Sequence, residues 1–259
     1  MKYTFKNIIF VFDIDGTLIP SSSNFIENKL LGLLKDLAKR NKVIFASARP
    51  MKGIINLLPN NIIKDFNYVS LNGAYSIIDN VESETNPFSF KKINILIKHF
   101  SKNNLWLYSK NKWYSSNFNS LEYFKETQAV KMEANYLNTE KKYESIHKAV
   151  ILTKSKKDLR LLEYYDFNFS CSNSTYVEIN CKGVNKALFI KQNNINNVQL
   201  CSFGDAENDL PLFKISNYSI SMKNSNPKLS KVSSYHTSKN YYEGIIEGLN
   251  FINKKILKK

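Results

Sequence analysis

The stretch that decides the fold is Val11-Phe12-Asp13-Ile14-Asp15-Gly16-Thr17-Leu18. It places two carboxylates, Asp13 and Asp15, directly after an apolar run. Residues 8–12 are typical of a short buried strand, which the Gly16-Thr17 pair ends. Ligands of open α/β sheets bind at the carboxyl ends of strands, so acids at this point are suited to hold a metal ion and to present a nucleophile. A strand followed by a polar turn is the alternative interpretation.

The composition predicts a folded globular protein. With 259 residues the chain is long enough to bury a full core in one large domain or two smaller ones. No apolar stretch is long enough to span a bilayer, and the first residues lack the pattern of a signal peptide, so we expect no membrane partner. Three cysteines without metal-ligand spacing, Cys171, Cys181 and Cys201, indicate reduced thiols of a cytoplasmic protein.

The formal net charge of +15 allows more than one interpretation. A strongly basic chain attracts nucleic acid, and it also attracts small anionic substrates. The lysines are scattered, apart from a terminal group of Lys254, Lys255, Lys258 and Lys259, and no groove-reading motif is present. We interpret the charge as compositional drift with attraction of phosphates as a by-product, and we expect no nucleic-acid partner.

Strands and helices alternate near both ends of the chain. The apolar periodicity predicts strands at 8–12, 43–46, 68–71, 200–203 and 218–222, and helices at 24–40, 51–58, 186–192 and 210–214. A β-α-β order implies right-handed crossovers and a mostly parallel sheet.

The middle of the chain has a different pattern. It predicts helices at 90–100 and 157–165, a strand at 149–153, a hairpin of 105–108 with 112–115, and a second hairpin of 167–170 with 176–179 across Ser172-Asn173-Ser174. The fold class is therefore α/β: a Rossmann-like, mostly parallel sheet core, formed by residues 1–80 and 181–259, with an inserted α+β cap domain at residues 81–180.

Four elements that carry chemistry follow one another along the chain. They are Asp13-x-Asp15-Gly16-Thr17, then Ser47 after a buried strand, then Lys186, and finally Gly204-Asp205-Ala206-Glu207-Asn208-Asp209 after another strand. In this order the chain resembles the haloacid dehalogenase-like hydrolases over essentially its whole length. It is most similar to the Cof-type branch (subclass IIB), whose C2b-type cap lies between the second and third motifs.

The resemblance implies a phosphatase that works through an aspartyl-phosphate. Asp13 would be the nucleophile, and Asp15 the general acid toward the leaving alcohol and then the base toward water. Lys186 and Ser47 would hold the transferring oxygens. Asp13, the backbone carbonyl of Asp15 and Asp205 would bind Mg²⁺, which prefers octahedral oxygen ligands.

The remaining candidate residues have supporting roles in this scheme. Gly16, Thr17 and Asn208 would contact the substrate phosphate. Asp209 would fix Lys186, while Arg49 and Asn72 would support the site. The second motif departs from the usual Thr-Gly-Arg of the family because it reads Ser47-Ala48-Arg49. Serine keeps the hydroxyl, but Ala48 removes the backbone freedom of a glycine.

Each candidate also has a purely structural interpretation. Asp205 and Asp209 are typical of a solvated turn and a helix N-terminus. Ser47 would suit a helix cap, Lys186 a solvent-facing position, and Arg49 a surface ion pair. Asn72-Gly73 has the pattern of a turn into the cap, with Asn72 facing the site. The three histidines, His99, His147 and His236, lie outside all four motifs, and we interpret them as structural or surface residues.

Three functions are compatible with these residues. A Mg²⁺-dependent phosphatase of small phosphorylated metabolites, such as sugar or cofactor phosphates, is the first. A phosphosugar mutase with the same nucleophile is the second, and a non-catalytic binding protein with the same fold is the third. The cap would read the leaving group, with Tyr108, Trp113, Asn173 and Ser174 as candidate contacts, but the pattern leaves open which face of the cap sheet meets the site.

Overall fold

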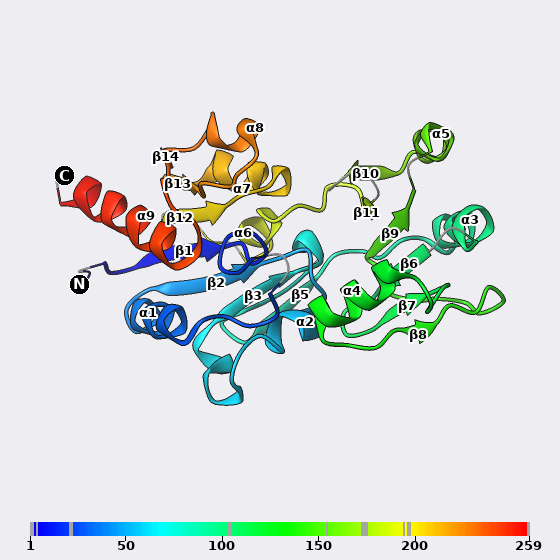
Figure 1. Cartoon of the computed structure of the whole chain (residues 1–259), viewed down its shortest axis with the longest axis horizontal. Coiled ribbons are helices and arrows are strands. Elements are labelled where there is room, and N and C mark those ends of the chain that lie inside the picture. Colours follow the sequence, from blue (N-terminus) through cyan, green and yellow to red (C-terminus); the bar gives the residue numbers. More distant parts are fainter. Residues whose placement is uncertain are drawn as a thin grey trace.

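The computed structural model describes residues 3, 5–20, 23–102, 105–153, 155–171, 176–193, 195 and 198–257. Its strands form two sheets that lie beside each other (Figure 1). Across the described residues, no helix combines the length and the hydropathy that a membrane span requires.

The larger sheet has eight strands in the order β14-β13-β12-β1-β2-β3-β4-β5. Six neighbouring strands run parallel: β14 (Tyr235–His236), β13 (Tyr218–Ser221), β12 (Gln199–Gly204), β1 (Ile8–Phe12), β2 (Lys42–Ala46) and β3 (Asn67–Ser70). Two antiparallel strands, β4 (Tyr75–Ile78) and β5 (Val81–Glu84), extend one edge. The α/β class and the mostly parallel sheet are thereby confirmed.

Helices cover both faces of this sheet, as expected where parallel strands are buried on both sides. The helical segments are α1 (Asn28–Ala38), α2 (Met51–Ile55), η1 (Asn60–Asp65), η2 (Leu71–Gly73), α6 (Leu188–Gln192), η3 (Glu207–Asp209), α7 (Leu210–Ile215), α8 (Pro227–Ser230) and α9 (Tyr241–Ile256). The helix expected at 51–58 ends at Ile55, and the one expected at 186–192 begins at Leu188, so Lys186 lies in the preceding turn.

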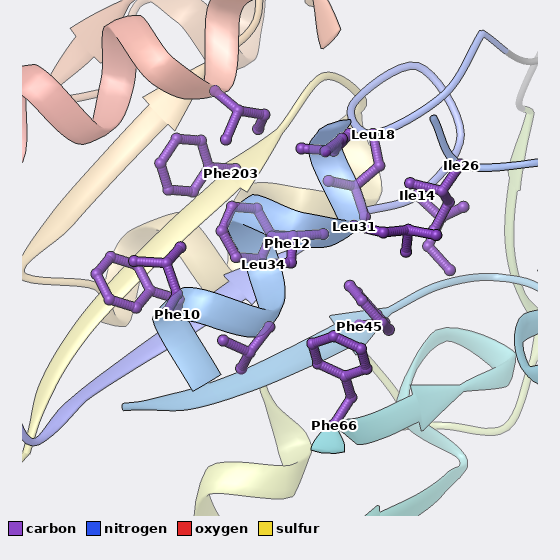
Figure 2. Packing of buried hydrophobic residues seen from close by; sticks show 14 of the residues in the cluster. Phe10, Phe12, Ile14, Leu18, Ile26, Leu31, Leu34, Phe45, Phe66 and Phe203 are labelled. Carbon is purple, nitrogen blue, oxygen red and sulfur yellow. The ribbon is translucent and has the colours of Figure 1, made fainter. Parts of the chain in front are cut away.

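Strand β1 is buried over its whole length because the side chains on its two faces pack into two different hydrophobic clusters. Phe10 and Phe12 pack with α1 and α9, whereas Ile9 and Val11 pack with residues of α6 and α7. Figure 2 shows Phe12 beside Phe203 of β12, and their ring centroids are 4.7 Å apart. This packing fixes the carboxyl ends of β1 and β12 next to each other.

The second sheet has six strands in the order β10-β11-β9-β6-β7-β8. Its elements are α3 (Phe90–Phe100), β6 (Leu105–Tyr108), β7 (Trp113–Ser115), α4 (Leu121–Val130), β8 (Asn135–Tyr136), β9 (Lys148–Leu152), α5 (Lys156–Tyr164), β10 (Asn168–Cys171) and β11 (Tyr176–Asn180). The structure pairs both expected hairpins, β6 with β7 and β10 with β11. Asn173 and Ser174 lie outside the described residues, as do Lys258 and Lys259.

The two faces of the second sheet differ in what they contact. Leu107, Ala149 and Ile179 belong to a cluster that also contains residues of α3 and α5. The opposite face carries Trp106 and Tyr108, which cluster with residues on the side of the larger sheet such as Leu71 and Val184. The second sheet therefore turns its aromatic and polar face toward the first.

Candidate active site

Three carboxylates meet at the carboxyl edge of the larger sheet. Asp13 follows β1, while Asp205 and Asp209 follow β12, and one oxygen atom of each lies within 4.8 Å of the others. The backbone N–H of Asp13 donates to the carbonyl of Phe203 over 3.0 Å, which extends the strand pairing as far as the nucleophile candidate. The parallel register therefore brings the first and fourth motifs together.

Lys186 lies among these acids and is fully buried. Its ammonium group donates to Oδ1 of Asp13 and, over 2.8 Å, to Oδ1 of Asp209. Burial by itself lowers the pKa of Lys186, but the two carboxylates outweigh it and the net shift is upward. The solvent-facing alternative for Lys186 is therefore wrong.

The nucleophile candidate has an unusual electrostatic environment. Burial raises the pKa of Asp13 well above its ordinary value, and Asp209 and Asp205 add to this while Lys186 opposes it. The pKa of Asp205 rises to about 6, from burial and from the charge of Asp209. One ammonium group among three carboxylates leaves an excess of negative charge, which a bound divalent cation would relieve.

Asp209 connects Lys186 to the loop after β12. Its second oxygen, Oδ2, accepts hydrogen bonds from the backbone N–H groups of Asp205 and Ala206, each over 3.1 Å. Both oxygens of Asp209 are thus occupied within the protein, and the residue is fully buried. Asp209 does lie at a helix N-terminus, directly before α7, and it is also bonded to Lys186 there.

The loop after β1 is built around Gly16 and Thr17. Gly16 has a φ of +88°, and a Cβ at this position would lie 2.2 Å from Oδ2 of Asp205. Thr17 is fully buried, and its hydroxyl donates to Oδ1 of Asp205 over 3.2 Å. The threonine side chain thus contacts an acid of the fourth motif in this structure.

Asp15 points to a different partner from Asp13. Arg49 holds it through two hydrogen bonds, Nε to Oδ2 at 2.8 Å and Nη2 to Oδ1 at 2.6 Å. The third guanidinium nitrogen, Nη1, donates to the carbonyl of Ala129 in α4. Arg49 is only 5% exposed, so it does not form the surface ion pair that was the alternative.

Ser47 lies buried at the carboxyl end of β2. Its Oγ accepts a hydrogen bond from the backbone N–H of Arg49 over 3.1 Å. The residue before α2 is Pro50, and no described side chain caps that helix, so Ser47 does not act as its cap. The hydroxyl instead shapes the loop of the second motif.

Asn72 and Asn208 lie together between the two sheets. Asn208 donates to Oδ1 of Asn72 over 3.2 Å, and Asn72 donates to Oε2 of Glu178 over 3.0 Å. Asn72 has a φ of 57° in the turn after β3, which confirms a turn at Asn72-Gly73, but this turn leads into β4 of the larger sheet and not directly into the second sheet. A Cβ on Gly73 would lie 2.1 Å from the carbonyl oxygen of Asn185, so this turn also packs against the residue before Lys186.

The sequence reasoning missed Lys148 and Glu178 on the second sheet. Lys148 donates to the carbonyl of Ala48 over 3.2 Å and pairs with Glu178 over 3.0 Å. The alternation of polar and apolar residues in β11 was a signal that could have found Glu178, whereas β9 reads Lys-Ala-Val-Ile-Leu and offers no such signal for Lys148. Of the expected cap contacts, Tyr108 bonds to Glu126 over 2.8 Å, and Trp113 is fully buried and bonds to the carbonyl of Met132.

The three histidines are not part of the acid cluster. His147 is fully buried and contacts Glu84 over 2.6 Å, while the ring of His99 lies 5.6 Å from that of Tyr165, centroid to centroid. His236 contacts the hydroxyl of Ser221 over 3.0 Å.

Comparison with known proteins identifies the family of this chain. The sequence profile of the haloacid dehalogenase-like hydrolases matches residues 10–249. The chain is 25% identical to a protein of Mycoplasma genitalium named putative phosphatase MG265, over 97% of this chain and 98% of that one. It is 24% identical to a putative phosphatase of Streptococcus pyogenes, over 92% of this chain and 95% of that one.

Solved structures share the fold. A haloacid dehalogenase-like hydrolase from Bacteroides thetaiotaomicron has a TM-score of 0.81 and 22% identity, over 95% of this chain and all of that chain. The subclass IIB sugar phosphatase BT4131 has a TM-score of 0.79 and 18% identity, over 95% of this chain and 98% of that chain. The profile match extends over most of the chain, and the protein therefore belongs to the haloacid dehalogenase-like hydrolase family.

Proposed function

We propose that this protein is a Mg²⁺-dependent phosphatase that hydrolyses small phosphorylated metabolites through an aspartyl-phosphate. The observation that carries the proposal is the buried cluster of Asp13, Lys186 and Asp209, with Asp205 beside it, at the carboxyl edge of the sheet. A core of structural acids has no need of this arrangement, whereas phosphoryl transfer depends on positioning and charge neutralisation.

The side chain of Asp13 is the proposed nucleophile. Its carboxylate oxygen forms a bond to phosphorus while the bond to the leaving oxygen breaks. Lys186 contacts Asp13 and would neutralise charge on the transferring oxygens, to which the hydroxyl of Ser47 would donate a hydrogen bond. Water then attacks phosphorus, the acyl phosphate bond breaks, and inorganic phosphate leaves.

The donor set fits Mg²⁺. The side chains of Asp13 and Asp205 and the backbone carbonyl of Asp15 would hold the ion, since these are the oxygen ligands it prefers. Bound Mg²⁺ supplies positive charge that offsets the repulsion between a phosphate dianion and the carboxylates. Asp209 already uses both oxygens within the protein, so we assign it to positioning Lys186.

Asp15 is the proposed general acid and base. It would give a proton to the leaving alcohol and then take one from the attacking water. Arg49 fixes the orientation of this carboxyl group through its two hydrogen bonds. Asn208, which lies next to Asn72, is proposed to orient the substrate phosphate together with Gly16 and Thr17.

We also propose that the chain is divided into a catalytic core and a cap. Residues 1–80 and 181–259 would form the catalytic core and residues 81–180 the cap, although strand β5 at 81–84 pairs with the core sheet.

We propose the cytoplasm as the site of action, which the three free cysteines support. A small phosphorylated metabolite is the proposed partner, and we expect no nucleic acid.

The test is the release of inorganic phosphate from a panel of phosphorylated metabolites and from 4-nitrophenyl phosphate. Each compound is assayed with Mg²⁺, with a chelator, and with the Asp13→Asn variant. An Asp36→Asn variant removes an exposed carboxylate of α1 and serves as the matched control. Metal-dependent release that Asp13→Asn abolishes supports the proposal. Absence of release, or release by Asp13→Asn at the parent rate, overturns it.

A further inference from the structure

A charged pair on the second sheet faces the candidate active site. Lys148 of β9 and Glu178 of β11 are joined by an ion pair of 3.0 Å, with side chains only 6% and 17% exposed. Lys148 also reaches the carbonyl of Ala48 in the second motif, and Glu178 accepts from Asn72 in the turn after β3. The pair therefore spans both loops that flank the site.

The register of the second sheet explains this position. Glu178 pairs with Val150, and Lys148 pairs with Asn180, so the two charged residues are diagonal neighbours on one face. Tyr108 lies opposite Lys148 on the adjoining strand β6. The intervening residues of the strands face the apolar cluster under α3 and α5. The chain thus places its polar residues of this sheet on the face that meets the site.

The cations in this region are neutralised within the protein. Glu178 neutralises Lys148, and Asp15 neutralises Arg49. Glu126 is a further carboxyl group in the same region, and it accepts a hydrogen bond from the hydroxyl of Tyr108. Burial raises the pKa of Glu126 although Lys148 and Arg49 oppose the shift. Lys148 and Arg49 thus each have a carboxylate partner within the protein.

We propose that Glu178, by neutralising Lys148, makes the site select phosphate monoesters with an uncharged leaving group over those whose leaving group carries a second anionic group. The inference rests on the proposed phosphatase function, in which the leaving group lies on the side of Asp15. A hydroxyl group donates to Glu178 and accepts from Lys148. A second carboxylate or phosphate faces Glu178 instead, and like charges at a desolvated contact are unfavourable.

Two matched pairs of compounds test this selection. Glycerol 3-phosphate and 3-phosphoglycerate differ by a hydroxymethyl group against a carboxylate, as do glucitol 6-phosphate and 6-phosphogluconate. For each compound we would measure kcat/KM, or, where it is not turned over, its inhibition constant against hydrolysis of 4-nitrophenyl phosphate. The readout is the ratio of kcat/KM, or of the inhibition constants, between the two compounds of a pair for one variant. A general loss of activity affects both compounds and cancels in this ratio.

Two single variants, Glu178→Gln and Lys148→Met, change the ratio in opposite directions, and the double variant combines them. The parent protein is expected to prefer the uncharged member by about tenfold or more, and Glu178→Gln to reduce this preference by about tenfold because Lys148 becomes free to pair with the anion. Lys148→Met is expected to increase the preference, since Glu178 is then unpaired. The double variant is expected to return the ratio close to that of the parent.

The matched control is Glu82→Gln. Glu82 of β5 pairs with Lys110 of the turn after β6, so this variant removes the same charge from another contact between the two sheets, at a position where the glutamate is 56% exposed. Its ratio is expected to equal that of the parent. Circular dichroism verifies folding, and Lys148→Met keeps the inference testable if Glu178→Gln does not fold.

The outcomes separate the inference from the proposed function. The selection is overturned if the parent hydrolyses the two members of each pair with equal kcat/KM, or if Glu178→Gln and Lys148→Met leave the ratio unchanged. In either case, metal-dependent hydrolysis of 4-nitrophenyl phosphate would still support the proposed phosphatase function. If Lys148 and Glu178 had a purely structural role, their variants would lower kcat/KM for both compounds of a pair by the same factor. A changed ratio therefore excludes a purely structural role. Absence of metal-dependent hydrolysis of 4-nitrophenyl phosphate overturns the proposed function itself.

Discussion

Lys186 donates a hydrogen bond of 2.8 Å to Asp209, and both side chains are fully buried. The same aspartate accepts from two backbone N–H groups of the loop that carries Asp205. One buried carboxylate therefore positions both the cation of the site and a proposed metal ligand. Replacing this carboxylate removes one of the two anionic partners of Lys186 and leaves Asp13 as the other, which makes this contact a sensitive place to test.

The Asp209→Asn variant keeps a carbonyl oxygen for the backbone N–H groups but loses the negative charge. We expect its free energy of unfolding to fall by about 1.5–3 kcal/mol, because a charge-assisted hydrogen bond to Lys186 is lost while Lys186 keeps Asp13 as a partner. Urea unfolding followed by circular dichroism measures this. Asp36→Asn, which removes an exposed partner of Lys39, is the control and should unfold at the parent concentration of urea. Equal midpoints for the two variants would contradict a buried pair at Asp209.

Gly16 provides a second test because its backbone and its surroundings both require glycine. Gly16→Ala places a Cβ where Oδ2 of Asp205 lies, and it strains a backbone with a φ of +88°. Gly183→Ala is a matched control, since Gly183 has a φ of +81° but no atom of the described residues lies within 4 Å of the Cβ that alanine would add. Both variants should lose about 1–2 kcal/mol of stability from backbone strain.

Only the Gly16→Ala variant is expected to lose Mg²⁺ binding and activity. Its Cβ displaces the carboxylate of Asp205, whereas a Cβ on Gly183 meets no atom of the described chain. Isothermal titration calorimetry with Mg²⁺ and phosphate release compare the two. Equal effects on metal binding would show that strain, and not displacement of Asp205, controls the site.

Much of the core could be predicted from the sequence because local patterns determine it. The apolar run of β1 is buried on both faces, and the acids of the first and fourth motifs each follow a strand. Parallel neighbours necessarily bring their carboxyl ends to one edge, so the motifs imply their own proximity. The family resemblance then supplied Lys186, whose burial no local pattern indicates in a chain this rich in lysine.

Other elements escaped prediction for physical reasons. Strand β5 reads Val-Glu-Ser-Glu and is mostly exposed, so it lacks the apolar pattern of a core strand. Helix α4 buries Tyr123 and Val130 but exposes Leu121 and Phe124, which obscures its amphipathic period. The roles of Lys148 and Glu178 depend on which face of the second sheet meets the first. That choice is made by long-range packing and not by the sequence of either strand.

The pKa of Asp205 predicts how Mg²⁺ binding varies with pH. Burial and Asp209 raise this pKa from 3.8 to about 6 in the folded protein, so the folded state holds the proton more tightly than the unfolded state. In the absence of metal, this group therefore makes the protein less stable as the pH rises from about 4 to about 6. Mg²⁺ needs the ionised carboxylate, so binding must release the proton.

We expect the stabilisation by Mg²⁺ to grow as the pH rises through about 6, with the apparent dissociation constant increasing about tenfold per pH unit below that value. The change in melting temperature on adding Mg²⁺, measured across this range, checks the sign. Asp205→Asn cannot ionise and is the control, for which we expect little stabilisation at any pH. Stabilisation that stays constant across the range would contradict a titrating ligand at Asp205.

Arg49 allows the proposed acid to be tested without changing the acid itself. Its guanidinium group makes two hydrogen bonds to Asp15 and a third to the carbonyl of Ala129, and an ammonium group cannot reproduce this fork. Arg49→Lys should therefore lower kcat for alkyl phosphates by about tenfold, but affect 4-nitrophenyl phosphate much less because a good leaving group needs no proton. Steady-state kinetics on the two classes measures the difference, and Arg40→Lys, at an exposed position after α1, is the control. Equal losses on both classes would assign Arg49 to binding the phosphate and not to orienting Asp15.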